Sequence, residues 1–251
     1  MRASTIWRAG VALLLLAAWE TVARSAQTLL LPTVSDTMSA LARLLMSAAF
    51  WSALWISHQA LLLGFVSAAL IGVPLGLAFG HWPSLGRWVR PHLQIMLVVP
   101  TAAVIPLVIM VAGLSLRARG LVVFMFAFPV IAVTAEAGMR EANARLLEMA
   151  RSFGATPAQM MWRVRLPAAW PAVLAGLRLG LARAFSGMVV GELVLMAAGI
   201  GGLLMKFQSD FDAASVYAVV AVVVLESVVL MRVVAVAEQR LLGWQDRPAF
   251  G

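Results

Sequence analysis

The chain has 251 residues, of which 63% are hydrophobic and 12% charged, whereas soluble globular proteins contain about 45–50% apolar and about 25% charged residues. So little charge cannot give a folded chain a solvated surface, and so much apolar material excludes intrinsic disorder. The composition therefore excludes an ordinary soluble enzyme. It predicts an all-α, polytopic membrane protein that forms a single transmembrane domain over residues 1–251.

The net charge is +8 and the sequence pI is about 11.6. Basic residues that flank membrane spans on the cytoplasmic side account for this charge. No basic run is interleaved with stacking aromatic residues, as a nucleic-acid groove requires, so we expect contact with membrane lipid and not with nucleic acid. The absence of cysteine excludes disulfides, and His58, His81 and His92 lack the spacing of metal ligands, so no metal site is expected.

Six segments have the length and apolarity of membrane spans, which need about 20 residues each. The third segment carries no charge but contains Pro100 and Pro106. Because each proline removes a backbone donor, we expect this helix to be kinked and packed against protein instead of lipid. In chain order, the six predicted spans are 9–23, 58–80, 93–113, 119–135, 171–191 and 213–231.

The distribution of basic residues predicts the orientation of these spans. If the N-terminus lies inside, twelve arginines fall in the inside connections and five basic residues in the outside connections, so the positive-inside rule places both termini in the cytoplasm. An alternative for the first span is a cleaved signal peptide, because Arg2 and Arg8 precede a short apolar run. Its removal leaves the direction of every later span unchanged.

The inside connection between the fourth and fifth spans, residues 139–168, is predicted to form a helix–turn–helix. An apolar face at helical spacing leads to Gly154, a residue that commonly ends helices. Thr156 and Gln159 then fit a capping box, and we expect the second helix to end before Pro167. The connection therefore displays apolar side chains beside arginines, among them Phe153, Met160, Met161 and Trp162. Such a surface either lies on lipid headgroups or fits a groove on another protein.

Glu148-Met149-Ala150, then Gly154, then Val164-Arg165-Leu166-Pro167 resembles the EAA loop of ABC importer permeases, whose pattern is Glu-Ala-Ala, three residues, Gly, nine residues and Ile-x-Leu-Pro. Segments such as LPTVSDTMSALARLL and LLLGFVSAALIGVPLGLAFG are similar to the nitrate/sulfonate/taurine branch of that family. The resemblance covers nearly the whole chain.

This resemblance implies a multi-pass permease subunit in a bacterial inner membrane. It would translocate a small anionic solute, such as an aliphatic sulfonate, taurine or nitrate, by alternating access. The implied partners are cytoplasmic ABC ATPase subunits, a second permease copy in a homodimer and an extracytoplasmic substrate-binding protein. The residues of the ATPase-coupling loop carried over from the family pattern are Glu148, Ala150, Gly154, Leu166 and Pro167; Phe153 and Met160 join them as exposed apolar residues.

ATP and Mg are expected on the partner ATPase, and no cofactor is expected in this chain. Its single lysine, Lys206, lies in LLMKF and not in a phosphate-binding loop. The chain is therefore predicted to have no catalytic site.

Charged residues in and beside the fifth span are the candidates for the translocation pathway. Arg178, Arg183 and Glu192 are costly in lipid and are expected to face the interior of the bundle or water. The arginines either attract an anionic substrate or are neutralised in ion pairs, for example with Glu136, Glu192 or Glu226. The fifth span also contains the pairs Gly176/Gly180 and Gly187/Gly191, which permit close approach of a helix in the same chain or in a second copy.

Three alternatives remain at this point. The same type of permease could carry a thiamine-precursor pyrimidine or another small cofactor. A secondary transporter would carry its own energy coupling within broken helices. An intramembrane serine protease would use Ser186, although no histidine follows His92 to act as its base.

Overall fold

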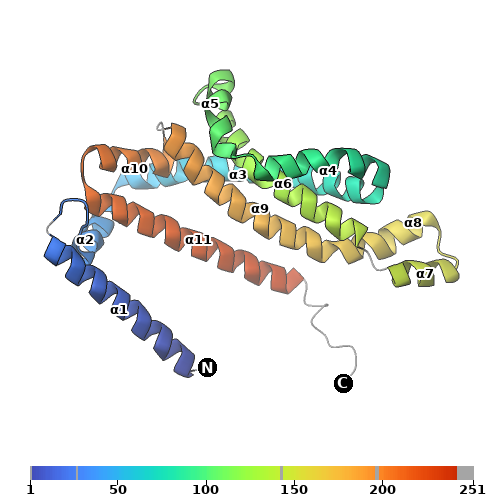
Figure 1. Cartoon of the computed structure of the whole chain (residues 1–251), viewed down its shortest axis with the longest axis horizontal. Coiled ribbons are helices and arrows are strands. Elements are labelled where there is room, and N and C mark those ends of the chain that lie inside the picture. The colour runs from blue at the N-terminus through green and yellow to red at the C-terminus, as the bar shows by residue number, and fades with distance from the viewer. Residues whose placement is uncertain (1, 27, 142–143, 196–197, 242–251) are drawn as a thin grey trace.

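The structure is a computed structural model that describes residues 2–26, 28–141, 144–195 and 198–241 (Figure 1). These residues form helices and no strands, which confirms the all-α prediction. The elements are α1 (Arg2–Ala26), α2 (Val34–Leu45), α3 (Ala48–His81), α4 (Pro83–Val98), α5 (Thr101–Ala112), α6 (Leu116–Arg140), α7 (Ala144–Ser152), α8 (Pro157–Met160), the π-helical segment η1 (Met161–Arg165), α9 (Leu166–Leu195), α10 (Gly199–Ser209) and α11 (Ala213–Leu241).

Within the described residues, four helical stretches are long and apolar enough to cross a membrane: Ala48–His81, Leu116–Arg140, Pro157–Val194 and Ala213–Arg240. A fifth crossing is obtained if α4 and α5 count together as one broken span. The predicted segments 58–80, 119–135, 171–191 and 213–231 lie within these four stretches. The first predicted span, 9–23, lies within α1, and the count of six spans stays a prediction.

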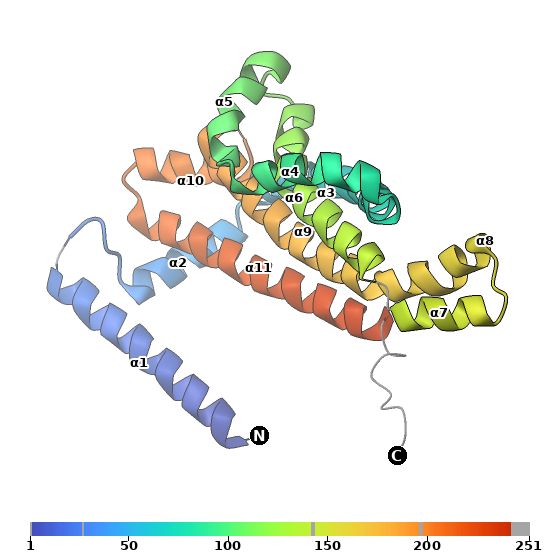
Figure 2. The ribbon, with the colours of Figure 1, turned by 45° about the vertical axis from the view of Figure 1, so that its right-hand side comes forward.

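The predicted third span, 93–113, is not one kinked helix. It is divided between α4 and α5, whose axes differ by 96°. Val99 is extended and Pro100 precedes α5, because a proline disfavours helical backbone at the residue before it. In both views α5 turns away from α4 and projects together with the start of α6 (Figures 1 and 2). Only part of α5 packs against protein, since Ile105 is buried but Val111 is exposed.

The centre of the structure is α6, which packs between α3 and α9. Glycines on both neighbours allow this close approach: a Cβ on Gly64 of α3 would overlap Val123, and one on Gly187 of α9 would lie 2.6 Å from Phe126. The two glycine pairs of the fifth predicted span therefore face α6 of the same chain. All four positions meet α6 side chains: Gly176 meets Thr134, Gly180 meets Ile131, Gly187 meets Phe126 and Gly191 meets Val122.

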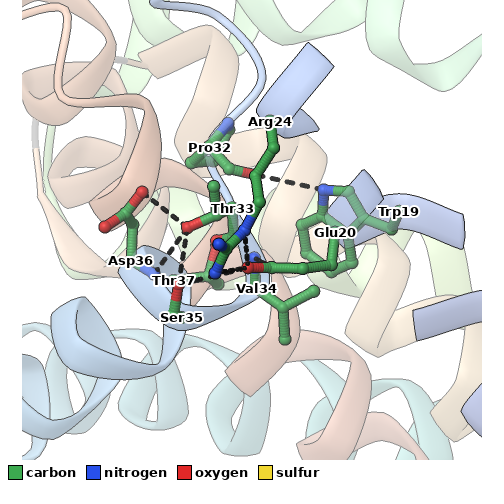
Figure 3. A network of polar contacts seen from close by, with 9 residues as sticks. All are labelled: Trp19, Glu20, Arg24, Pro32, Thr33, Val34, Ser35, Asp36 and Thr37. Atoms are coloured by element: carbon green, nitrogen blue, oxygen red, sulfur yellow. Dashed lines mark hydrogen bonds and ion pairs between the residues drawn. The ribbon is translucent and has the colours of Figure 1, made fainter. Parts of the chain in front are cut away.

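Polar contacts join α1 to α2 at one end of the structure (Figure 3). The Glu20 carboxylate accepts hydrogen bonds from Val34 N at 2.7 Å and from Arg24 Nε at 2.8 Å. Trp19 Nε1 donates to the Pro32 carbonyl at 3.1 Å. Beyond this joint, α2 packs against α11 in a second apolar cluster with the start of α3 and with α10. Pro32 and Val34, at the start of α2, are thus held by side chains of α1.

Candidate functional site

Residues 144–165 form an arm in which α7 and α8–η1 lie side by side beyond the packed helices (Figure 2). The arm lies within the predicted connection 139–168, of which residues 142–143 lie outside the described residues. The second half of the arm, α8–η1, continues without interruption into α9, so that a single helical stretch runs from Pro157 to Val194. The arm is therefore attached directly to one of the four apolar helical stretches.

The turn of the arm depends on Gly154, whose φ is +74°. The amide of Ala155 donates to the Ala150 carbonyl at 3.0 Å, and the amide of Gly154 donates to the Arg151 carbonyl at 2.9 Å. These two bonds are the Schellman motif, which ends a helix with one residue in the left-handed conformation. Gly154 and Ala150 thus set the end of α7 through their backbone groups.

The predicted capping box is present immediately after the turn. Thr156 N donates to Gln159 Oε1 at 2.9 Å, and Gln159 N donates to Thr156 Oγ1 at 3.3 Å. Both groups would otherwise be free donors at the start of a helix. The arm is therefore ordered by its own local hydrogen bonds.

The expectation that the second helix ends before Pro167 is wrong. The amide of Leu166 donates to the Met161 carbonyl five residues back, and this wider π-helical turn leads into α9. A proline inside a regular helix has no backbone N–H to donate, and its ring crowds the turn that precedes it. In this chain, the turn that precedes Pro167 is the wider π-helical turn of η1. Pro167 consequently lies in the first turn of α9, exposed, beside the half-buried Leu166.

The apolar side chains of the arm are not covered by the rest of the described chain. Phe153 is 84% exposed and Trp162 is 72% exposed. Glu148 is exposed on α7, and Met160 is half-buried. At the base of the arm, Arg165 Nη1 lies 3.5 Å from His81 Nδ1 at the end of α3. The arm thus presents exposed apolar side chains together with the Glu148 carboxylate and the exposed Arg151 and Arg163, while its base contacts the end of α3.

Arg178 and Arg183, five residues apart on α9, have different surroundings. Arg178 Nη1 forms an ion pair with Glu238 Oε2 of α11 at 2.8 Å. This carboxylate is none of the three that the sequence suggested as partners. Arg183 is exposed and has no hydrogen bond or ion pair with any residue in the described ranges. Of these two arginines, Arg183 alone presents an uncompensated charge.

Glu192 is 2% exposed and holds the start of α10. Its Oε2 accepts hydrogen bonds from Ser57 Oγ at 2.8 Å and from Gly201 N at 3.0 Å, and Ser57 Oγ accepts one from Ile200 N at 2.9 Å. The start of α10 is thereby fixed to α3 and α9. Arg119 lies at the same small gap between the helices as Glu192, which places a cation beside the buried carboxylate.

Two further contacts between a basic side chain and a carboxylate join helices that sequence reasoning left separate. Arg90 Nε of α4 donates to Glu136 Oε1 of α6 at 2.9 Å, and His58 Nε2 of α3 lies 2.6 Å from Glu226 Oε1 of α11. Both carboxylates lie within apolar stretches of the sequence. A carboxylate in such a stretch indicates a polar or charged partner, so the sequence predicted that a partner exists. The identity of the partner depends on which helices are neighbours.

The serine alternative has no structural support. Ser186 Oγ donates to the Ala182 carbonyl at 3.1 Å. All three histidine rings contact other groups: His58 contacts Leu54 and Glu226, His81 contacts Arg165, and His92 contacts Trp88. In the described part of the chain, no cluster of three histidine or carboxylate side chains suits a metal ion.

Comparisons with known proteins agree with this arrangement. Residues 68–243 match the family described as "Binding-protein-dependent transport system inner membrane component". The chain is 29% identical over 242 residues to the taurine transport system permease protein TauC of Escherichia coli (strain K12), covering 94% of this chain and 88% of that protein. It is 30% identical over 216 residues to the putative aliphatic sulfonates transport permease protein SsuC of Bacillus subtilis (strain 168), covering 86% of this chain and 78% of that protein.

The fold is shared with a solved structure of the MetNI methionine ABC transporter in an inward-facing conformation. The TM-score is 0.59 at 24% identity, and the match covers 84% of this chain and 98% of that chain. The taurine and sulfonate relatives confirm the resemblance to that branch, and the family is one of transport proteins and not of enzymes. The chain belongs to the binding-protein-dependent transport system inner membrane components, the permease subunits of ABC transporters.

Proposed function

We propose that this ABC permease carries a small solute with an anionic group, such as an aliphatic sulfonate, taurine or nitrate, across a bacterial inner membrane by alternating access. The relatives that transport taurine and aliphatic sulfonates support this substrate class. The unpaired charge of Arg183 on a membrane-spanning helix supports it independently, because a lone cation there favours an anionic partner.

The arm is the proposed docking element for a cytoplasmic ATPase. The observation that carries this proposal is the exposure of Phe153 and Trp162 on a rigid helical hairpin. An apolar knob of this kind fits a groove on another protein. Because α8, η1 and α9 form one continuous helix, a displacement of the arm by the ATPase acts directly on the helix that bears Arg183.

The proposed docking surface contains the residues predicted from the family pattern, each with a distinct role. Glu148, Phe153 and Met160 contact the groove, while Ala150 and Gly154 shape the turn that presents them. Leu166 and Pro167 set the direction in which the helix leaves the arm.

The complete transporter is proposed to contain two permease copies, two ATPase subunits that bind ATP and Mg, and an extracytoplasmic substrate-binding protein. The permease itself binds no cofactor. Six crossings, with both termini and the arm in the cytoplasm, satisfy the excess of arginine in the inside connections. They require α1 to be a span and α4–α5 to act as one broken span.

The experiment that tests the docking proposal is a membrane pull-down with a cytoplasmic ABC ATPase from the same organism. Wild type is compared with Phe153→Ser and Glu148→Lys after equal membrane insertion has been verified. Leu29→Ser is the matched control, because Leu29 is also highly exposed, at 87%, but lies in the connection between α1 and α2. We expect wild type and Leu29→Ser to retain the ATPase and the two arm variants to lose it.

Retention of the ATPase by both arm variants contradicts docking through the arm, which would then be a surface that lies on lipid headgroups. Transport of a pyrimidine but of no sulfonate, taurine or nitrate by the assembled transporter replaces the proposed substrate class with the cofactor alternative.

A further inference from the structure

We propose that the hollow beside the α4–α5 break is a subsite for the sulfonate group of the substrate, with Arg183 as its cation. The proposal rests on the proposed function, because it assumes that the permease carries an organic anion. The hollow has a volume of about 310 Å³ and is lined by the end of α4, the start of α5, and parts of α6 and α9. Pockets for small molecules measure about 300–1,000 Å³, so this one suits a small solute.

The hollow combines one charge with apolar walls. Arg183 is the sole charged residue among those that line it, and Thr101 adds a hydroxyl, while Met125, Phe126 and Val190 belong to the apolar wall. Arg183 has no ion-pair partner in the described ranges, whereas Arg178 on the same helix is paired with Glu238. The difference indicates that Arg178 holds α9 against α11 and that Arg183 is left free to meet a ligand.

The position of Arg183 makes this free charge informative. At about 1.5 Å per residue, Arg183 lies roughly 18 Å along α9 from Leu195, well inside the apolar stretch that ends at Val194. An arginine at such depth is costly unless it faces water or a counter-ion. The apolar walls also strengthen its attraction for an anion, since they lower the local dielectric constant.

The backbone of the break supports the same assignment. Val99 and Pro100 are extended where α4 gives way to α5, and both line the hollow. Irregular backbone at membrane depth is tolerated where it is covered by protein or lines a water-filled cavity. The break between α4 and α5 and the unpaired guanidinium of Arg183 therefore line the same hollow, and α6 forms another of its walls.

The guanidinium and the Thr101 hydroxyl give this hollow the polarity that a sulfonate needs. A sulfonate presents three acceptor oxygens and no donor, and arginine offers a planar fork of donors to such groups. The carbon chain of the substrate would contact the apolar wall. This arrangement requires only transient binding, as a solute in transit must also leave the site.

The test uses proteoliposomes that contain the complete transporter, with the permease, its ATPase and its substrate-binding protein. Uptake of radiolabelled taurine and ethanesulfonate and the ATPase activity stimulated by the binding protein are measured together. The variants are Arg183→Gln, Arg183→Lys and Thr101→Val. The matched control is the double variant Arg178→Gln/Glu238→Gln, which removes a span arginine together with its partner.

We expect Arg183→Gln to lower sulfonate uptake by at least about ten-fold, the effect of losing a charge-assisted hydrogen bond, while stimulated ATPase activity stays near wild type. Arg183→Lys restores part of the uptake and Thr101→Val lowers it less. In the double variant, uptake and stimulated ATPase activity change together, so that their ratio stays at the wild-type value, because the Arg178–Glu238 pair only holds α9 against α11. Wild-type uptake by Arg183→Gln overturns the subsite and leaves the proposed function standing. Equal loss of uptake and ATPase activity in Arg183→Gln also overturns it, because Arg183 then supports assembly. If wild type takes up neither sulfonate, the subsite falls together with the organic sulfonates of the proposed substrate class, and uptake of labelled nitrate then decides whether the rest of the proposed function stands.

Discussion

The packed centre around α6 and the arm formed by α7 and α8–η1 are ordered in opposite ways. Around α6, glycines of α3 and α9 let helices approach until backbone meets side chain. In the arm, local hydrogen bonds set the shape, and Phe153 and Trp162 remain exposed. The helices of the centre therefore cover one another, whereas the arm presents a surface that the described residues leave uncovered. Substitutions in the centre should remove the folded permease, and substitutions in the arm should remove its response to the ATPase.

The largest effect is expected at the glycines of the centre. Gly176→Leu should abolish most of the monodisperse permease extracted in detergent, because a Cβ at this position would overlap Thr134 Oγ1 on α6. Yield is measured by size-exclusion chromatography of equal amounts of membrane. Gly10→Leu is the control, since a Cβ on Gly10 meets no atom within 4 Å. Normal yield of Gly176→Leu would show that α6 and α9 do not pack this closely.

The next effect is expected at the turn of the arm. Gly154→Val should lower the ATPase activity stimulated by the binding protein at least about ten-fold, because a β-branched residue is strongly disfavoured at a φ of +74°. The yield of folded permease should stay normal. Gly154→Asn is the matched control, since asparagine tolerates the left-handed conformation and should keep most of the activity. Equal activity of the two variants contradicts a role for the turn geometry.

Glu192 connects the centre to α10 and should show an intermediate loss of stability. Glu192→Ala removes the acceptor for Ser57 Oγ and Gly201 N and leaves both buried donors without a partner, at a cost of about 3 kcal/mol. Ser57→Ala should cost about 1–2 kcal/mol, since it frees one buried amide, that of Ile200. Thermal unfolding in detergent compares the two variants. A greater loss for Ser57→Ala than for Glu192→Ala would contradict the central place of the carboxylate.

The contrast between centre and arm also explains how much the sequence predicted. Hydropathy locates α6 and α9 because a span is a property of about 20 consecutive residues. Gly154 and the Thr156 capping box predict the turn of the arm for the same reason: their signals are local. The pairing of Arg178 with Glu238 depends on which helices are neighbours, over a separation of 60 residues. No local pattern carries that information.

Two features were missed for different reasons. The helix α2 had a local signal, because Thr33 caps it by accepting a hydrogen bond from Asp36 N, as its Thr-x-x-Asp spacing indicates. The continuity of η1 with α9 had none, since Pro167 favours a helix end and the π-helical turn that accommodates it is a property of the folded arm. Local sequence patterns therefore predict a helix end where hydrogen bonds within a few residues determine it. They predict it wrongly at Pro167, where the preceding π-helical turn lets the helix continue.

The smallest effect is expected at the joint between α1 and α2 (Figure 3), which lies at the opposite end of the structure from the arm (Figure 1). Glu20→Ala removes the acceptor for Val34 N at the start of α2, so limited proteolysis within residues 28–33 should become a few-fold faster while transport is unchanged. Arg24→Ala is the matched control, because it removes only the exposed ion pair and leaves the bond from Glu20 to the backbone. An exposed pair contributes little, so its cleavage rate should equal that of wild type. Faster cleavage in Arg24→Ala than in Glu20→Ala would mean that the ion pair, and not the backbone contact, holds α1 against α2.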